Sequence, residues 1–412
     1  MFKGAKVKRC LICENNIGPF MSFGKMPIAN GFLTPEEFES EYFFELKVGF
    51  CPECKMVQLM GQPKREMMFH QDYAFFSSTS TRMSLHFKEF ADLVMKNILK
   101  STDPFVVEIG SNDGIMLQNF TKAGIRHLGV EPSANVADTA IKKGIQTICE
   151  FFDENIARQI VVKHGQADAI IAANVMCHIP YLHSIASGVK LLLKPNGVLI
   201  FEDPYLGDIV EKMAYDQIYD EHAFYFSVAS ISYLFEKRGL KVVDIIPQGV
   251  HGGSMRYVIA HKGTREESKA VSEQREKEKQ LGLYSTDTFQ QLRQNIDQSR
   301  DNLMDLLLNC QKRGKRVVGY AATSKSTTVI NYCGITTDLV KFISDTTPIK
   351  QGKCSPGAHI PVRPYKEFTN NYPDYALLFA WNHVEEIMAK EQKFVESGGK
   401  WIVYVPKVQV LE

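Results

Sequence analysis

The stretch Phe105-Val-Val-Glu-Ile-Gly-Ser-Asn-Asp-Gly114 begins with a short apolar run, Phe105 to Ile109, that is typical of a buried β-strand. A turn with two glycines follows, and the apolar spacing from Ile115 to Phe120 then predicts a helix. Glycine lets the backbone approach a ligand closely, and the helix N-terminus offers N–H groups to that ligand. Strand, turn and helix in this order predict the opening unit of a nucleotide-binding α/β sheet.

The turn favours a ligand other than a dinucleotide, because it lacks the G-x-G-x-x-G spacing that binds a pyrophosphate. Glu108 ends the strand, where a carboxylate would repel a pyrophosphate but would pair with an ammonium group. About 20 residues further on, Glu131 ends a second apolar run, where an acid typically binds ribose hydroxyls. A ligand with an ammonium end and an adenosine end is S-adenosylmethionine. The residues expected to bind it are Glu108, Gly110, Asn112, Gly114, Glu131 and Pro132. An ordinary strand–glycine–helix unit without this ligand is the less favoured alternative.

Length and composition limit the possible classes of protein. A chain of 412 residues with 44% apolar residues predicts two or three domains with sizeable cores. A net charge of +1 gives no general attraction to nucleic acid or anionic membranes, and no apolar run approaches the ~20 residues that span a bilayer. Residues 1–10 are basic but lack the apolar core of a secretion signal. We therefore expect a cytoplasmic protein without nucleic-acid or membrane partners.

Two C-x-x-C pairs, Cys10/Cys13 and Cys51/Cys54, predict a four-thiolate zinc site within an N-terminal domain of residues 1–72. Four protein ligands leave no open coordination position, so the predicted zinc is structural. A nucleic-acid-binding zinc knuckle is less favoured because the segment is only mildly basic. A redox C-x-x-C is less favoured because no βαβ unit surrounds either pair.

The segment Tyr73–Arg82 is rich in hydroxyl groups and aromatic rings, and two interpretations of it stay open. It is either a solvated turn or the wall of a polar pocket into which Tyr73 points. The spacing of apolar residues over 83–99 predicts a helix that leads into the strand at Phe105.

The central domain, residues 73–262, continues with strands predicted over 144–149, 167–174 and 198–202. Open α/β sheets bind ligands beyond the carboxyl ends of their strands. Phe152, Asn174, His178 and Glu202 stand at such ends. Phe152 could contact an adenine ring, although adjacent aromatic residues belong to a core as often.

The segment Ile218–Ser227 has the densest chemistry of the chain and contains Tyr219, Glu221, His222 and Tyr225. An imidazole flanked by a phenol and carboxylates predicts a general base with its orienting partners. A solvated surface stretch is the alternative. The segment His251–Arg256 combines two glycines with basic groups, which suits an anionic or keto-bearing substrate or an ordinary turn.

Residues 263–310 predict an exposed helical connector, and residues 311–412 predict a second α/β domain. We expect strands over 316–320, 339–343 and 375–380, and a last strand over 401–405. Lys325 follows the first of these strands, which suits a phosphate at a helix N-terminus, and His359 lies on a loop that could face the same cleft. A scaffold or oligomerisation unit is the alternative for this domain. The sequence carries no signal that predicts an oligomeric state.

These motifs together resemble the sugar C-methyltransferases that act on nucleotide-linked 4-keto-deoxyhexoses. The resemblance covers nearly the whole chain: the cysteine pairs, E-I-G-S-N-D-G, Y-D-E-H-x-x-Y-F-S, and the late G-Y-x-A-x-x-K and G-x-H-I-P segments. It implies a zinc domain, a central Rossmann-like methyltransferase domain and a C-terminal Rossmann-like α/β domain that hold a sugar nucleotide between them. The catalytic residues that it implies are Tyr73, His178, Tyr219, Glu221 and His222. The substrate contacts expected with it are Tyr225, His251, Arg256, Lys325 and His359.

The expected reaction is methylation at C-3 of the sugar in branched deoxysugar biosynthesis, since the C-4 ketone acidifies the C-3 hydrogen. His222 is expected to remove that proton, assisted by Glu221 and Tyr219, while His178 or Tyr73 stabilises the enolate oxygen. An O- or N-methyltransferase on another metabolite or RNA is the second hypothesis, and it leaves His222 and the last domain unexplained. A zinc-bearing scaffold that binds a nucleotide without turnover is the third.

Overall fold

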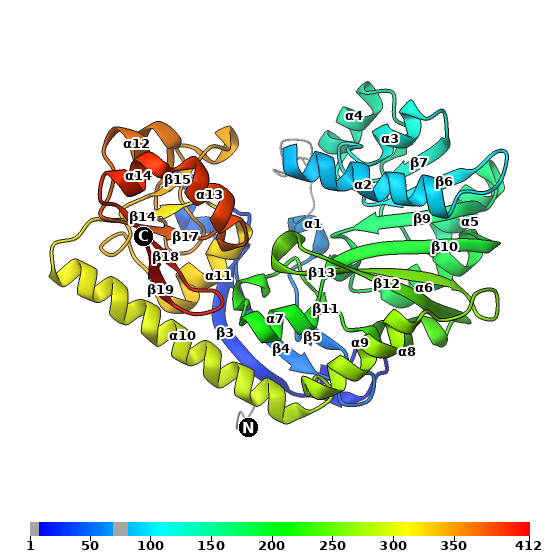
Figure 1. Cartoon of the computed structure of the whole chain (residues 1–412), viewed down its shortest axis with the longest axis horizontal. Coiled ribbons are helices and arrows are strands. Elements are labelled where there is room, and N and C mark those ends of the chain that lie inside the picture. The colour runs from blue at the N-terminus through cyan, green and yellow to red at the C-terminus, as the bar shows by residue number, and fades with distance from the viewer. Residues whose placement is uncertain (1–7, 69–80) are drawn as a thin grey trace.

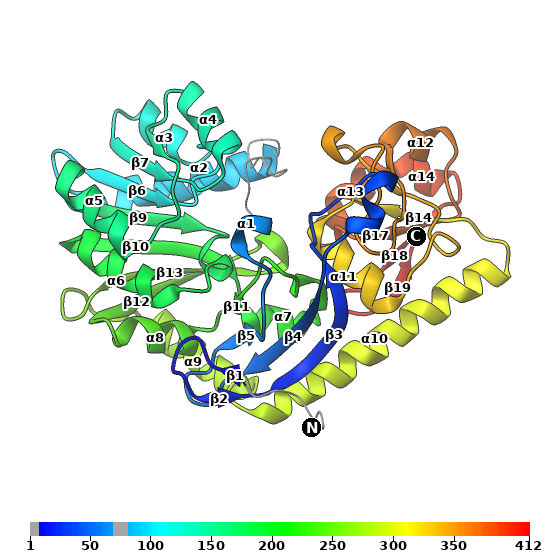
Figure 2. The ribbon, with the colours of Figure 1, turned by 180° about the vertical axis from the view of Figure 1, so that it is seen from behind.

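The computed structural model describes residues 8–68 and 81–412. Two α/β lobes face each other, with the strands of an N-terminal sheet at the base between them (Figure 1). The long helix α10 (Thr286–Lys312) runs along the base from one lobe to the other, as the reverse view also shows (Figure 2). The two lobes are the expected central and C-terminal domains.

The central lobe contains a seven-stranded sheet in the order β12-β13-β10-β9-β6-β7-β8. Its strands are β6 (Phe105–Ile109), β7 (Arg126–Val130), β8 (Thr147–Ile148), β9 (Ala167–Ala173), β10 (Leu193–Pro204), β12 (Leu240–Gln248) and β13 (Ser254–His261). All of β6 is buried, as expected for a strand with helices over both faces. Strands β6 to β10 pair in parallel and β13 pairs antiparallel to β10. The expected α/β sheet is confirmed. The sequence pattern did not predict the antiparallel strands β12 and β13, which extend one edge of this sheet.

Helices cover both faces of this sheet. The strand order reverses between β6 and β9, and open α/β sheets bind ligands at such a point. Local capping sets the bounds of some of these helices. Asp153 caps α5 by accepting a hydrogen bond from the Ile156 N–H at 2.9 Å, and Gly165 ends that helix at φ 84°. The helices of this lobe are α2 (Thr81–Asn97), α3 (Leu117–Lys122), α4 (Ala134–Lys142), α5 (Glu154–His164), α6 (Leu182–Leu192), α7 (Leu206–Lys212) and α8 (Val228–Glu236).

The N-terminal sheet includes a strand from the middle of the chain. Its order is β11-β5-β4-β3, and β11 (Phe224–Tyr225) begins two residues after His222. Phe224 pairs with Gln58 of β5, and the Leu59 N–H donates to the Ala223 carbonyl at 2.8 Å. The N-terminal segment is therefore built onto the segment that carries the predicted base. The sheet's other strands are β3 (Pro19–Pro27), β4 (Phe43–Phe50) and β5 (Val57–Leu59), and a short helix α1 (Arg65–Met68) follows. The strands β1 (Lys8–Arg9) and β2 (Asn16–Ile17) pair with each other in a separate two-stranded sheet.

The segment predicted as an exposed helical connector contains α9 (Lys269–Gln280) and α10, and its exposure is only partial. One face of α10 is buried although the helix is hydrophilic overall. Phe289 from this face contacts the rings of Phe20 and Phe50 at centroid distances of 5.1 and 4.4 Å. The connector is thus packed under the N-terminal sheet. Within the described part of the chain, no helix has the length and apolarity that crossing a membrane requires.

The C-terminal lobe has a six-stranded sheet in the order β16-β15-β14-β17-β18-β19. Its strands are β14 (Val317–Tyr320), β15 (Ile343–Asp345), β16 (Val362–Pro364), β17 (Tyr375–Leu378), β18 (Lys400–Val403) and β19 (Gln409–Leu411), and its helices are α11 (Ser324–Cys333), α12 (Tyr365–Asn370), α13 (Val384–Lys390) and α14 (Gln392–Glu396). All adjacent strands are parallel except β19, which pairs antiparallel to β18.

Two strand predictions in this lobe are corrected. Residues 339–342 lie before the strand, because the Leu339 and Val340 N–H groups bond back to Thr336 in a turn. Both side chains are buried, so apolarity alone could not separate turn from strand. The strand at 400–403 is also not the last, since β19 follows it as a short edge strand.

Candidate active site and metal centre

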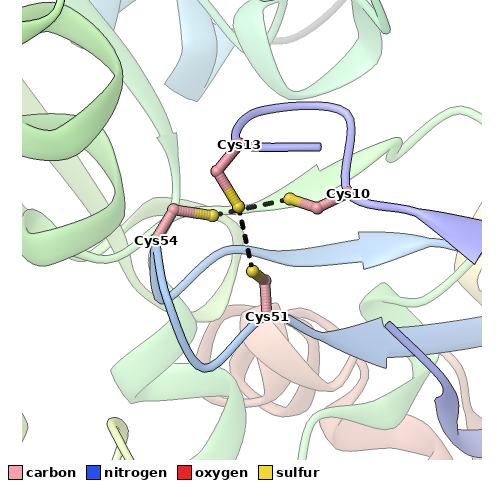
Figure 3. Close-up of side chains that lie close together, drawn as sticks. All are labelled: Cys10, Cys13, Cys51 and Cys54. Carbon is pink, nitrogen blue, oxygen red and sulfur yellow. Dashed lines mark hydrogen bonds between the residues drawn. The ribbon is translucent and has the colours of Figure 1, made fainter. Parts of the chain in front are cut away.

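The four cysteines of the two C-x-x-C pairs point toward a common centre (Figure 3). The sulfurs of Cys10 and Cys54 lie 3.5 Å apart, those of Cys13 and Cys51 lie 3.3 Å apart, and all four lie within 4.8 Å of one another. A tetrahedral zinc with Zn–S bonds of ~2.3 Å needs sulfurs ~3.8 Å apart, so the donor set fits Zn²⁺. Four thiolates would complete the coordination of such an ion and leave no open position.

The two cysteine turns are equivalent in their backbones. Glu14 donates its N–H to the Cys10 carbonyl at 3.0 Å, and Lys55 donates to the Cys51 carbonyl at 2.9 Å. Both residues have positive φ, 63° and 61°, which closes each turn around its pair of thiols. His183 of α6 contacts the Ile12 carbonyl at 2.9 Å, which attaches the first turn to the central lobe.

A cavity of about 430 Å³ lies at the carboxyl edge of the central sheet and is lined by residues from all three parts of the chain. Its size suits a small organic ligand. Twelve of the predicted site residues line it: Gly110, Asn112, Glu131, Pro132, Phe152, Asn174, His178, Tyr219, Glu221, His222, His251 and Lys325. The structure therefore brings the predicted cofactor turn and the predicted base into one space.

The turn after β6 has the shape that a ligand-binding loop needs. Gly110 has φ 67°, and a Cβ there would lie 2.3 Å from the Val175 side chain, so a larger residue would clash. Asn112 and Asn174 have positive φ of 46° and 56°, a conformation that asparagine tolerates better than most residues.

Glu131 is held at the cavity wall by backbone groups. Its carboxylate accepts hydrogen bonds from the Asn112 N–H at 3.0 Å and the Ser133 N–H at 2.9 Å. These two bonds oppose the effect of burial, which raises its pKa. The geometry suits a carboxylate that accepts the hydroxyl groups of a ribose.

Glu108 is buried directly behind the turn and does not line the cavity. Its Oε2 has no hydrogen-bond partner among the described residues, and burial, followed by the charges of Glu131 and Asp113, raises its pKa well above the ordinary value. A cationic ammonium group reaching this acid would lower that pKa again. An unpaired buried acid beside a glycine turn therefore fits the amino-acid end of S-adenosylmethionine.

His222 is held in one tautomer. Its Nδ1 lies 2.7 Å from the Gln217 carbonyl, which only accepts, so Nδ1 carries the proton of the neutral ring. Its Nε2 then accepts from the Tyr219 hydroxyl at 2.8 Å. Burial, followed by the charge of a protonated His178, lowers the pKa of His222 well below 6.5, so its ring is neutral at physiological pH. A neutral imidazole with its basic nitrogen toward a phenol can accept a proton.

His178 lies next to His222, with ring centroids 5.3 Å apart and planes inclined by 16°. Cys177, His178 and His222 place one donor atom each within 4.8 Å of the others. Both ring nitrogens of His222 are already bonded, to the Gln217 carbonyl and to the Tyr219 hydroxyl, so this ring has no nitrogen left for a metal ion. Burial lowers the pKa of His178 to about 4, which leaves a neutral N–H donor beside the base.

Glu221 faces the cavity and is contacted by the N-terminal segment. The Asn30 side-chain amide donates to Glu221 Oε1 at 2.7 Å, and the Ser324 hydroxyl of the C-terminal lobe donates to Asn30 Oδ1 at 2.9 Å. Burial raises the pKa of Glu221, while the Asn30 amide and the charge of Lys350 oppose that rise.

The C-terminal lobe contributes a buried cation to the cavity. Lys325 is in the first turn of α11, its Nζ lies 3.4 Å from the His251 carbonyl, and its charge lies 5.5 Å from the Trp381 ring. Burial lowers its pKa, and the charge of Asp216 opposes that shift. The Nε2 atom of His251 has no hydrogen-bond partner among the described residues, and burial lowers the pKa of this ring to about 3. A buried ammonium beside a neutral imidazole suits an anionic group of a ligand.

Three residues expected to bind the substrate do not line the cavity. Arg256 is 4% exposed, and its guanidinium binds Glu202 at 2.6 Å and stacks on Phe90, so it fastens α2 to the sheet. Glu202 is paired with Arg256 and with His86 at 2.7 Å, and it does not face the cavity either.

Tyr225 is buried within β11, where it pairs with Val57. His359 lies at the contact between the N-terminal and C-terminal parts, where it binds Glu41 at 2.8 Å and stacks on Phe38 at a centroid distance of 3.6 Å. Gly114 is behind the turn, where a Cβ would lie 2.2 Å from the Ile145 side chain. Tyr73 lies outside the described residues.

The sequence did not indicate several residues that line the cavity. Gln217 directly precedes the segment Ile218–Ser227, so a slightly wider motif would have included it. Asn30 lies far from both cysteine pairs and from every other motif. Arg65 lies over the ring of Phe151 at 4.0 Å and near that of Tyr181 at 5.4 Å, at the aromatic end of the cavity. Only the fold brings Asn30 and Arg65 here.

Three domain families match successive parts of the chain. Residues 10–69 match a zinc binding domain, residues 83–245 match a methyltransferase domain, and residues 249–406 match the C-methyltransferase C-terminal domain.

Similar proteins extend this comparison. The C-methyltransferase NovU of Streptomyces niveus is 33% identical over 408 residues, which cover 98% of this chain and 97% of that protein. The ubiquinone biosynthesis O-methyltransferase of Actinobacillus pleuropneumoniae is 31% identical over 105 residues, 23% of this chain and 44% of its own length. A solved structure of a SAM-dependent methyltransferase from Anabaena variabilis is 17% identical with a TM-score of 0.35, covering 43% of this chain and 86% of that chain.

Proposed function

The chain belongs to the S-adenosylmethionine-dependent C-methyltransferases related to NovU, and from this premise we propose that its substrate is a nucleotide-linked 4-keto-6-deoxyhexose, carried on dTDP or GDP and methylated at C-3. The observation that carries this proposal is the neutral, buried His222, whose basic nitrogen contacts Tyr219 inside the cavity that also contains the cofactor turn. Carbon methylation beside a ketone requires a base that removes a C–H proton. Methylation of a hydroxyl or amine requires no carbon acid.

Gly110, Asn112 and Glu131 would hold the cofactor at the carboxyl edge of β6 and β7. S-adenosylmethionine supplies a methyl group on a sulfonium, which a carbon nucleophile attacks. The protein provides the binding surface: Glu131 for ribose hydroxyls and Phe152 at the wall where the adenine would lie. Glu108, buried behind the turn, would act on the ammonium group through its charge and not by lining the cavity.

The proton at C-3 passes to Nε2 of His222 in this proposal, and the Tyr219 hydroxyl lies on its path because it occupies the hydrogen bond to that nitrogen. The Gln217 carbonyl stabilises the imidazolium that forms, through its bond to Nδ1. The neutral N–H of His178 donates to the developing enolate oxygen. Lys325 and His251 receive the anionic nucleotide side of the substrate.

Formation of S-adenosylhomocysteine with a panel of sugar nucleotides tests this proposal. We expect turnover with 4-keto-6-deoxy sugars on one carrier among dTDP, GDP and CDP, and no turnover with the corresponding 4-hydroxy sugars, which cannot enolise. Turnover on a 4-hydroxy sugar, or none with any keto sugar, would contradict the proposal and favour an O- or N-methyltransferase.

The pH dependence of kcat/KM reports on Glu221. A carboxylate beside His222 stabilises its imidazolium, so the reactive form has Glu221 deprotonated and the rate rises with pH. Because burial raises the pKa of Glu221, we expect the acid limb above the ordinary carboxyl value of 4.5. His222 and His178 do not produce this limb near 6.5, since burial lowers both pKa values. In Glu221→Gln the limb should disappear, and its persistence would assign it to another group.

Replacement of Glu131 tests the cofactor assignment. Glu131→Ala removes the acceptor for two ribose hydroxyls, and each lost bond to a charged group costs about 1.5–3 kcal/mol. We expect the Kd for S-adenosylhomocysteine, measured by calorimetry, to rise at least tenfold. Asp153→Ala is a matched control, because this acid caps a helix of the same lobe outside the cavity. An unchanged Kd in Glu131→Ala would remove Glu131 from the cofactor site.

A further inference from the structure

Ala29 and Asn30, in the loop after β3, form a bridge between the two lobes. On one side they contact the acidic pair beside His222: the Ala29 N–H donates to Asp220 Oδ1 at 3.0 Å and the Asn30 amide donates to Glu221 Oε1 at 2.7 Å. On the other side they contact α11: Thr327 donates to the Ala29 carbonyl at 2.8 Å and Ser324 to Asn30 Oδ1 at 2.9 Å.

The direction of these bonds fixes the orientation of the Asn30 amide. A carboxylate only accepts, so the NH₂ group of Asn30 must face Glu221. Its carbonyl oxygen then faces Ser324, which has a hydroxyl proton to donate. A reversed amide would place its oxygen against the carboxylate, which is repulsive, whereas the Ser324 hydroxyl could accept from the NH₂ group as readily as it donates to the oxygen. Glu221 therefore sets the orientation of the amide, and the bond from Ser324 holds the amide in that place.

We propose that Asn30 is a positioning residue of the methyl-transfer reaction, which holds Glu221 toward the cavity only while the C-terminal lobe is docked through Ser324. The proposal rests on the proposed function and adds a role for the N-terminal segment. That segment stabilises the structure through its zinc, and it also delivers the side chain that orients the acid beside the base.

Three titratable groups lie around Glu221. Asp220 precedes it in the chain, His222 follows it as a neutral ring, and the charge of Lys350 in the C-terminal lobe opposes the rise of the Glu221 pKa. The Lys350 ammonium donates to the Ala322 carbonyl at 2.8 Å, and no bond from it to Glu221 is present among the described residues. Asn30 is the side chain whose hydrogen bond to Glu221 the structure records.

Asn30→Ala and Asn30→Asp test the proposal. Removing the amide withdraws a donor from the carboxylate, so the acid limb of kcat/KM should move upward by about one pH unit. Because the pKa of Glu221 is about 7, kcat/KM at pH 7 should then fall about fivefold. Asn30→Asp places a second acid against Glu221 and should move the limb further. Ser324→Ala should give a smaller shift in the same direction. The Kd for S-adenosylhomocysteine and the zinc content should stay within twofold of the wild type.

Glu41→Gln is the matched control for a merely structural role. Glu41 also joins the N-terminal segment to the C-terminal lobe, through Gly357 and His359, but it does not contact Glu221. We expect Glu41→Gln to lower the unfolding temperature and leave the acid limb in place. The proposal is overturned if Asn30→Ala keeps the wild-type limb, or if Glu41→Gln moves it equally.

An infrared titration keeps this test separate from the proposed function. One carboxylic-acid band should be present in the wild type and absent in Glu221→Gln, and it reports the protonation of Glu221 without turnover. The pH at which this band reaches half of its full intensity should rise in Asn30→Ala, even if every sugar in the panel fails as a substrate. An unchanged midpoint would overturn the role of Asn30 independently of the identity of the substrate.

Discussion

His222→Ala should lower the methylation rate by roughly 10²–10⁴-fold, the usual contribution of a general base. The ring is held by the Gln217 carbonyl and the Tyr219 hydroxyl, and no other group among the described residues presents a neutral imidazole nitrogen to that phenol. The cofactor turn is formed by residues of β6 and β7, so the Kd for S-adenosylhomocysteine should stay within about twofold. Initial rates and calorimetry on the same preparation measure both quantities.

His127→Ala is the matched control for this prediction. His127 is a buried histidine of β7 that contacts Thr121 and the Ile125 carbonyl, away from the cavity. Its replacement should lower stability without a comparable loss of turnover. A His222→Ala enzyme with more than a tenth of the wild-type rate would show that another group removes the proton.

Cys51→Ser should release the zinc and abolish activity together. Structural Zn²⁺ contributes about 10–16 kcal/mol of apparent binding free energy in zinc-finger peptides, so a site with three thiolates should not keep its turns folded. Because β11 belongs to the same sheet as β5, loss of that sheet should also displace the segment Tyr219–His222. The measurements are zinc content by atomic emission, thermal unfolding and turnover.

Cys149→Ser is the control for this loss of metal, because Cys149 is an exposed thiol outside the cluster. It should retain one zinc per chain and the wild-type unfolding temperature. If Cys51→Ser kept both its zinc and its activity, the four-thiolate site and its link to β11 would be wrong.

Much of the fold was predictable because its signals are local. The strand β6, the glycine turn and the helix that follows depend on apolar spacing and on backbone angles within a few residues. The C-x-x-C pairs are equally local, since each pair closes its own turn. The strand β11 was not predictable, because two residues carry no periodicity and their pairing partner Gln58 is far away in the chain.

The candidate site divides in the same way. The predicted base and its partners are close in the sequence: His222, Tyr219 and Gln217 lie within six positions of one another. One segment therefore indicated His222 and its partner Tyr219. Arg256 and His359 carry the right chemical groups, but tertiary contacts use them elsewhere: Arg256 pairs with Glu202, and His359 with Glu41. Asn30 had no distinguishing neighbour in the sequence, and only the docking of three parts of the chain places it against Glu221.

Exchange of the C-3 hydrogen with solvent deuterium, in a sugar nucleotide that the enzyme accepts and without the methyl donor, tests the central claim most directly. The account predicts that the wild-type enzyme exchanges this hydrogen, as seen by NMR, and that His222→Ala does not. Methylation of the sugar without any exchange, or exchange that survives His222→Ala unchanged, would contradict proton removal by His222.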